Sequence, residues 1–255
     1  MRSDPNPGLS HRISAADRAG LIALVAESVS AFTEREALQC LRHPFSSAQV
    51  VKTIASVRGL RSTASVRKAI ALHPTAPRTD ALHCLDDLGW RDLLDVGREA
   101  RTPAPVRLAA NLKIVEKLSH LSAGERMTLA RLADRGLLRP LLADPDRRVF
   151  AALLRNPRLI VEDLVAFAST GNPLPEHLAI LAADTVWSER PPLRRALLRS
   201  SRTPRFAAVA LLPRTSREEL RDLTEDPSID KFVSVCASRL LEDEPRVVDR
   251  PRREV

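Results

Sequence analysis

Eight arginines are concentrated between residues 190 and 217, in a stretch without lysine, aspartate or glutamate. The planar guanidinium group binds phosphate or carboxylate through two parallel hydrogen bonds. The block therefore points to an anion-binding surface, for a nucleic-acid backbone or for an acidic segment of a protein. The formal net charge of the chain is +8, and this block alone equals that excess.

The arginines share one face of a helix that is predicted to begin near residue 192. Arg195, Arg199 and Arg202 are spaced i, i+4 and i+7, and Leu193 and Leu197 fall on the opposite face at 100° per residue. Two further arginines occupy equivalent positions of an internal repeat. The predicted partner-binding residues are Arg155, Arg194, Arg195, Arg199, Arg202, Arg205 and Arg239.

An acidic stretch follows the arginine block directly and supports a second interpretation. Its carboxylates are close enough in sequence to pair with the arginines, which would leave an ordinary solvated helix face. Both interpretations, an anion-binding surface and a paired, solvated one, stay open at this level. The acidic residues are Glu218, Glu219, Asp222, Glu225, Asp226 and Asp230.

No motif for catalysis, metal binding or cofactor binding is present in the sequence. The eight glycines include no Gly-x-Gly pair, so the dinucleotide fingerprint and the phosphate loop are missing. Cys40 and His43 have ligand-like spacing without a second pair, and His83 and Cys84 are adjacent and would diverge on a helix. Three cysteines do not make a disulfide framework. We predict a protein without cofactor or metal and without enzymatic activity.

Two tryptophans keep one enzymatic alternative open. Trp90 lies close to Asp87 and Asp92, and Trp187 lies close to Asp184 and Glu189. We predict that both tryptophans serve packing. The enzymatic alternative for these residues is the one that the family resemblance below implies.

An internal repeat organises the chain. Five segments begin with a branched apolar residue and carry a small residue three positions later and an apolar residue four positions later, which places these positions on one helical face. Their starts are 40, 43, 44 and 40 residues apart, and Arg155, Arg199 and Arg239 each lie six residues after a start. The segments are Val66–Ala69, Val106–Ala109, Val149–Ala152, Leu193–Ala196 and Val233–Cys236.

Helix boundaries repeat as well. Asp-Pro or Thr-Pro precedes several segments, as at Asp144 and Asp226, and predicts a helix start. His43, His73 and Asn156 each precede a proline, which predicts a helix end with these residues in the left-handed conformation. The copy at Val106–Ala109 lacks this stop, and its first helix is expected to reach about residue 118. Second helices are predicted at Thr79–Leu88, Ile160–Ala168, Pro204–Leu212 and Ser216–Thr224, with another that opens at the capping box Ser122–Glu125 and closes at Gly136.

The stretches Asp144–Val149 and Pro105–Ala109 resemble the HEAT and leucine-rich-variant families of bacterial α-solenoids, over roughly residues 34–243. The resemblance implies an all-α fold: a short right-handed solenoid of about five helical hairpins of 40–44 residues with a concave face for partners. Residues 10–32 are predicted to form one N-terminal capping helix. One repeat domain is expected over residues 10–243, between disordered tails at 1–9 and 244–255.

Composition narrows the function. Charged residues make up 28% of the chain and its longest apolar run, at 206–212, is far too short to span a membrane, so a cytoplasmic protein is expected. Aromatic residues are only 3%, which argues against a surface that stacks unpaired bases. The leading hypothesis is a non-catalytic scaffold that binds a protein partner, which the arginines suggest is acidic, on its concave face. The alternatives are sequence-independent binding of nucleic acid through phosphates and, more remotely, a HEAT-like DNA glycosylase.

Overall fold

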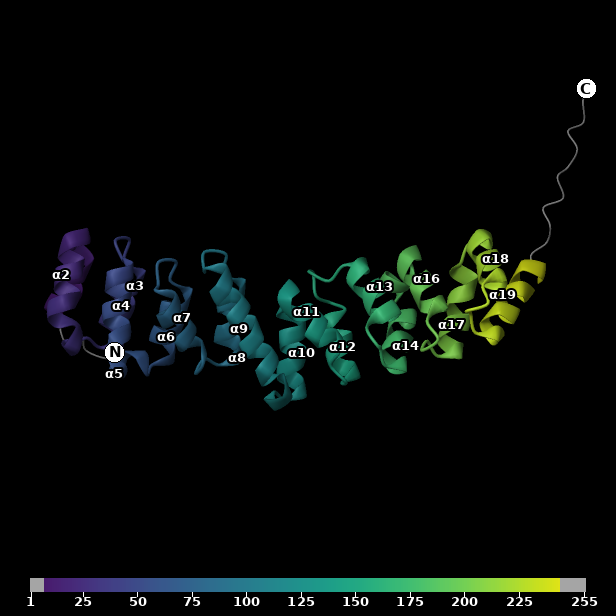
Figure 1. Ribbon diagram of the computed structural model, residues 1–255, viewed down its shortest axis with the longest axis horizontal. Coiled ribbons are helices and arrows are strands. Elements are labelled where there is room, and N and C mark those ends of the chain that lie inside the picture. Colours follow the sequence, from purple (N-terminus) through teal and green to yellow (C-terminus); the bar gives the residue numbers. More distant parts are fainter. Residues whose placement is uncertain (1–6, 244–255) are drawn as a thin grey trace, which may run out of the picture. The chain divides into compact units, whose positions relative to one another are not determined.

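The computed structural model describes residues 7–243, which form nineteen α-helices and three short 3₁₀ helices without any β-strand (Figure 1). The all-α fold class is therefore confirmed. The described residues divide into two compact units, unit 1 over residues 7–121 and unit 2 over residues 122–243. None of the described helices is both long enough and apolar enough to cross a membrane. The right-handed solenoid and the single repeat domain over 10–243 stay predictions.

Unit 1 packs its helices mainly in sequential pairs, such as α6 with α7 and α8 with α9. Gly97 has no side chain between α8 and α9, and an added Cβ would lie 2.5 Å from Asn111 Oδ1. The two helices therefore approach closely at this residue. The elements are α1 (Pro7–Ala15), α2 (Arg18–Ser28), η1 (Val29–Ala31), α3 (Glu34–Arg42), α4 (Ala48–Ser56), α5 (Arg58–Arg61), α6 (Ala64–Leu72), α7 (Arg78–Leu85), α8 (Trp90–Arg98), α9 (Ala104–Lys117) and η2 (Leu118–His120).

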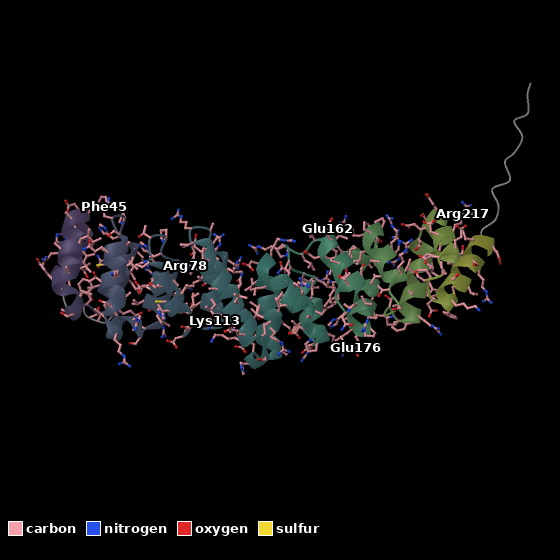
Figure 2. The ribbon with its side chains drawn as sticks, in the orientation of Figure 1. Phe45, Arg78, Lys113, Glu162, Glu176 and Arg217 are labelled. Atoms are coloured by element: carbon pink, nitrogen blue, oxygen red, sulfur yellow. The ribbon has the colours of Figure 1, made fainter. Side chains whose placement is uncertain are left out.

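Unit 2 also packs helices that are near one another in the chain: α18 pairs with the next helix α19, α10 pairs with α12, and α13 pairs with α16. In Figure 2 the side chains of Glu162 and Arg217 project from one edge of this unit, and Glu176 projects from the opposite edge. The elements are α10 (Ala123–Leu132), α11 (Arg135–Leu142), α12 (Arg147–Leu153), α13 (Val161–Thr170), α14 (Pro175–Ala183), α15 (Thr185–Ser188), α16 (Pro191–Arg199), α17 (Arg205–Leu211), η3 (Leu212–Arg214), α18 (Arg217–Glu225) and α19 (Lys231–Asp243).

The expected helical hairpins do not account for all the helices, because a period contains three α-helices, or four in the case of α12 to α15, rather than two. The period that starts at α6 contains α7 and α8, and the one that starts at α16 contains α17 and α18. A helical hairpin would have one long second helix. In these two periods, a loop that carries proline or glycine divides that helix into two. The four second helices that were predicted with both bounds exist within one to three residues at each end, whereas α8, α11, α14 and α15 were not predicted.

The repeated segments form the core as predicted. Their first residues are all buried, from Val66 to Val233, and the residues four positions later are fully buried. The small residues at the third position are only half-buried, apart from Ala152. The periodic apolar residues therefore face the neighbouring helices, and the small ones border them.

The N-terminal region differs from the single capping helix predicted over residues 10–32. Two helices occupy it, because the Asp17 side chain accepts the N–H of Gly20 at 2.7 Å and starts α2 anew. Residues 7–9 belong to α1, and Leu9 is buried, so the predicted tail is wrong for these three residues. The remaining tail predictions, 1–6 and 244–255, lie outside the described residues.

The helices end close to the predicted residues, but the backbone conformation of these residues differs from the prediction. His43, His73 and Asn156 all follow helix ends, but their backbone is extended or right-handed, and Asn172 is the one non-glycine residue in 7–243 with a positive φ, at 52°. A following proline disfavours helical backbone before it. Each of the three side chains instead accepts the N–H two residues later, at 2.8–3.2 Å.

The capping box at Ser122 is confirmed, since its hydroxyl accepts the N–H of Glu125. Helix α9 ends at Lys117, close to the expected end at about residue 118. The predicted closure at Gly136 is wrong: α10 ends at Leu132 and Gly136 lies inside α11. The side-chain amide of Asn156 binds the backbone oxygens of Ala130 and Ala133, which allows α10 to end before Gly136.

Candidate interaction surface

The predicted arginine and leucine faces of α16 are present. Leu193 and Leu197 are fully buried, whereas Arg195 and Arg199 are exposed. Arg202 does not continue the helical face, because α16 ends at Arg199 and Arg202 lies in the loop that follows. The expectation of one i, i+4, i+7 stripe is therefore wrong for its last member.

The downstream acids neutralise most of the arginines on α16. Arg195 Nε lies 2.9 Å from one carboxylate oxygen of Glu219 on α18, and Arg194 lies 3.5 Å from the other. Arg199 lies 3.8 Å from Asp226. Arg194 is only 7% exposed, so this guanidinium belongs to the packing between helices more than to an open surface.

Two further predicted residues are paired in the same way. Arg155, which follows α12, lies 3.3 Å from Asp184. Arg205 at the start of α17 lies 3.0 Å from Asp230, and its guanidinium also lies 5.7 Å from the ring centre of Phe232. Each of these pairs joins an arginine to an acid 25 to 29 residues later in the chain. The surface therefore carries charges of both signs.

Arg202 and Arg239 complete the predicted set and differ from the others. Both side chains are exposed, and no carboxylate within residues 7–243 forms an ion pair with either of them. They are the predicted arginines whose guanidinium groups are available to an outside anion.

Exposed apolar residues beside these arginines were missed by the sequence interpretation. Phe206 on α17 is 73% exposed, and Phe232 and Val235 on α19 are about half exposed. Neighbouring Ala207 and Ala208 are buried, so the helical phase of α17 directs Phe206 outward. The sequence could have indicated this, because the helical position of Phe206 within the apolar run at 206–212 differs from that of the residues that face the core.

Both tryptophans have structural contacts, as predicted. Trp90 is buried, and the Arg91 guanidinium lies 5.1 Å from the centre of its ring. Trp187 Nε1 donates to the backbone oxygen of Leu154 at 3.1 Å. Asp184, beside Trp187, accepts the N–H groups that start α15. The acid beside Trp187 is therefore occupied in capping and ion pairing.

The cysteines and histidines do not converge. Within residues 7–243, no three side chains of His, Cys, Asp or Glu lie close enough together to hold a metal ion. Cys40 and Cys84 are buried, and burial raises the pKa of these thiols to about 12 and about 11. Neither group is positioned for nucleophilic chemistry at neutral pH.

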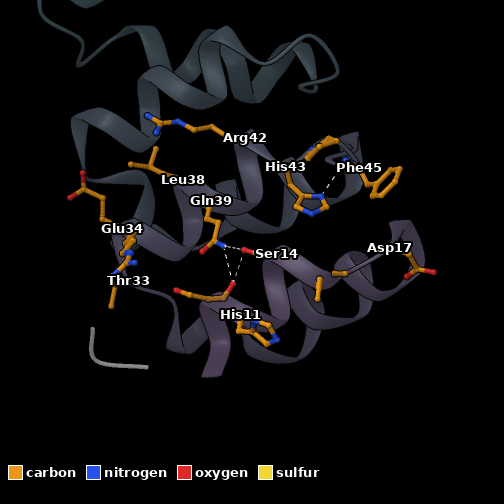
Figure 3. A pocket seen from close by; sticks show the side chains of 15 residues that line it. His11, Ser14, Asp17, Thr33, Glu34, Leu38, Gln39, Arg42, His43 and Phe45 are labelled. Atoms are coloured by element: carbon orange, nitrogen blue, oxygen red, sulfur yellow. Dashed lines mark hydrogen bonds between the residues drawn. The ribbon is translucent and has the colours of Figure 1, made fainter. Parts of the chain in front are cut away.

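A groove of about 1460 Å³ lies between α1 and α3 in unit 1 (Figure 3). Gln39 Nε2 crosses it to donate to the Ser10 backbone oxygen at 2.9 Å and to Ser14 Oγ at 2.7 Å. Phe45 is half exposed at one end. The lining mixes both charges with apolar side chains and shows no preference for one kind of ligand.

No protein-family model matches the chain, and no curated protein or solved structure matches it either.

Proposed function

We propose that this chain is a non-catalytic interaction module of the HEAT-like or leucine-rich-variant solenoid class. It binds a protein partner through the arginine-bearing surface of α16, α17 and α19 in unit 2. Three features support the class: the period of 40–44 residues, the buried repeat positions, and the sequential pairing of helices within each unit. The extra helix in each period is a variation on the hairpin pattern.

The kind of partner is argued from the pairing of charges. Residues 122–243 contain 19 basic and 17 acidic residues, and arginines 195, 199 and 205 are each paired with an acid. Binding of a nucleic-acid backbone requires many uncompensated cations, which this surface lacks. A protein partner can use charges of both signs.

The observation that carries the proposal is the exposure of Phe206 beside this mixed-charge surface. Large aromatic side chains are enriched in protein interfaces, where they supply much of the binding free energy. Phe206, Phe232 and Val235 lie on two helices that contact each other. Arginine beside aromatic is a frequent combination in such interfaces.

The test is affinity capture of partners from native cell extract with the full chain as bait. The variant Phe206→Ser/Phe232→Ser removes the exposed aromatics, and Ile160→Ser/Leu174→Ser removes two exposed apolar side chains elsewhere in unit 2 as a matched control. We expect the wild type and the control to retain the same proteins after nuclease treatment, and the aromatic variant to lose them. Capture that disappears with nuclease would instead establish nucleic-acid binding. Identical partners on all three baits would move the interface to another face.

A further inference from the structure

Three cavities adjoin one another along unit 2. The first, of about 490 Å³, lies between α11 and α13, and it shares Thr170 and Asn172 with the second, of about 420 Å³. The second lies between the ends of α13 and α16, and it shares residues 199–202 with the third, of about 480 Å³. The three neighbouring cavities, which share these lining residues, are together called the trough.

Five arginines line the trough, against two acids. The acids are Asp163 and Asp230, and each already binds one arginine of the lining at 3.0 Å. Arg199 has a long contact of 3.8 Å to an acid outside the trough. Arg139 and Arg202 remain, and within residues 7–243 no carboxylate forms an ion pair with either. Arg139 lines the first cavity, and Arg202 lines both the second and the third.

The helix ends in the trough carry partial negative charge, so the arginines determine whether the trough attracts or repels an anion. Helix α13 ends at Thr170 and α16 ends at Arg199, both in the lining of the second cavity. A helix C-terminus carries roughly half a negative charge, so the two ends together disfavour an anion by about one charge. Asp226 compensates Arg199, so Arg202 offsets the two helix ends in this cavity. Arg139 adds a further positive charge in the first cavity, and the trough as a whole therefore favours an anion. The last carbonyl groups of the helices remain able to accept N–H donors.

One polar residue in the lining supports a ligand site. Asn172, at the junction of the first two cavities, holds the left-handed backbone at φ 52° directly before Pro173, and its side chain is exposed. Non-glycine residues in this conformation carry strain and cluster at binding sites.

We propose that this trough binds an extended acidic segment of a protein partner. Carboxylates of the segment bind Arg139 and Arg202, and its backbone N–H groups donate to the free carbonyl groups at the helix ends. The inference rests on the proposed function and adds the chemistry of the partner. A protein segment fits better than a nucleic acid, because a phosphodiester backbone has no N–H groups for the carbonyl groups at the helix ends and no exposed aromatic lines the trough for base stacking.

The experiment measures binding of a labelled twelve-residue peptide of alternating glutamate and proline to the full chain by fluorescence anisotropy. Proline keeps the peptide extended, and a glutamine-for-glutamate peptide serves as the uncharged control. The variant Arg139→Gln/Arg202→Gln breaks no ion pair in the described chain. Its matched control, Arg131→Gln/Arg221→Gln, removes two exposed arginines of unit 2 outside the lining. We expect the trough variant to raise the Kd for the acidic peptide by about tenfold or more, since it removes two charge-assisted contacts. The control should change it less than twofold.

Three results would overturn the inference. One is a lack of binding by the acidic peptide at millimolar concentration. Another is equal weakening by both double variants, which would mean attraction by overall charge. The third is tighter binding of an oligothymidylate of equal charge, lost in the trough variant, which would assign the trough to nucleic acid. The capture experiment with the Phe206 variant judges the proposed function separately, so a peptide that fails to bind leaves that function standing.

Discussion

The side-chain amide of Asn156 donates a 2.7 Å hydrogen bond to the backbone oxygen of Ala130, 26 residues earlier in the chain. The same nitrogen donates to Ala133 at 3.0 Å, and the side-chain oxygen accepts the N–H of Arg158 at 2.8 Å. Asn156 is 3% exposed, so these bonds are shielded from water. One buried side chain thus joins the residues after α12 to the end of α10.

We expect Asn156→Ala to lower the free energy of unfolding by about 2–3 kcal/mol, because it leaves buried carbonyl oxygens without donors. Urea denaturation followed by circular dichroism measures the change. Asn156→Asp keeps the acceptor for Arg158 but places a carboxylate against two carbonyl oxygens. Its loss of stability should therefore be larger at pH 7 than at pH 4, where the carboxyl group is protonated. Equal losses at the two pH values would contradict this role.

The two kinds of ion pair in unit 2 should respond differently to removal of the arginine. Arg126 Nε lies 2.7 Å from Asp144, whose side chain is 4% exposed. Arg126→Gln leaves this carboxylate buried without its cation, and we expect a loss of about 3 kcal/mol. Arg195→Gln removes a partner of Glu219 at the surface and should cost less than about 1 kcal/mol. Similar urea midpoints for the two variants would contradict the contrast.

Stability should fall as the pH is lowered from 7 to 5.5. His177 is buried and stacked on Phe150 with the ring centres 4.2 Å apart, and burial lowers its pKa although Glu176 and Asp144 act in the opposite direction. Burial also lowers the pKa of His73. The unfolded chain therefore binds protons more readily than the folded one in this range, and acid favours unfolding. Urea midpoints across this range measure the effect.

His177→Gln should make the dependence of the urea midpoint on pH shallower without abolishing it, because His73 still titrates. Carboxyl groups contribute little above pH 5.5, since their ordinary pKa values are about 4. An unchanged slope in this variant would show that His177 does not carry the effect.

Two of the three thiols should resist modification in the folded protein. Burial raises the pKa of Cys40 and Cys84, so that little thiolate exists at pH 8. An Ellman assay in native buffer is expected to leave these two cysteines unmodified, and an assay in 6 M guanidinium chloride should count all three. Rapid native labelling of Cys40 or Cys84, located by peptide mapping, would contradict their burial.

The sequence predicted features that depend on local spacing. The i and i+4 apolar positions of the repeat identified buried residues such as Val149 and Leu153, and the Arg–Leu amphipathicity of α16 is present. Proline after His73 predicted a helix end, but the side-chain acceptor stabilises extended backbone there. Helices α8, α11, α14 and α15 were missed, because helices of four to nine residues have too few turns to show a clear periodicity.

Features that depend on how helices meet could not be predicted. The pairing of Arg195 with Glu219 depends on the register between α16 and α18, which sequence separation alone does not determine. The trough depends on the ends of α11, α13 and α16 lying side by side, so Arg139 and Asn172 carried no signal. Phe206 was recognisable only from its phase within α17.

The hydrogen bond from Trp187 to Leu154 spans 33 residues, and the ion pairs of unit 2 have a similar reach. Within unit 2, these contacts join the first helix of a period to the last helix of the same period. Such a chain should fold quickly, because closing short loops costs little entropy. The short reach of these contacts also has an evolutionary consequence. A period can be duplicated or deleted as a unit while the interactions inside the other periods stay intact, so the number of periods can change during evolution.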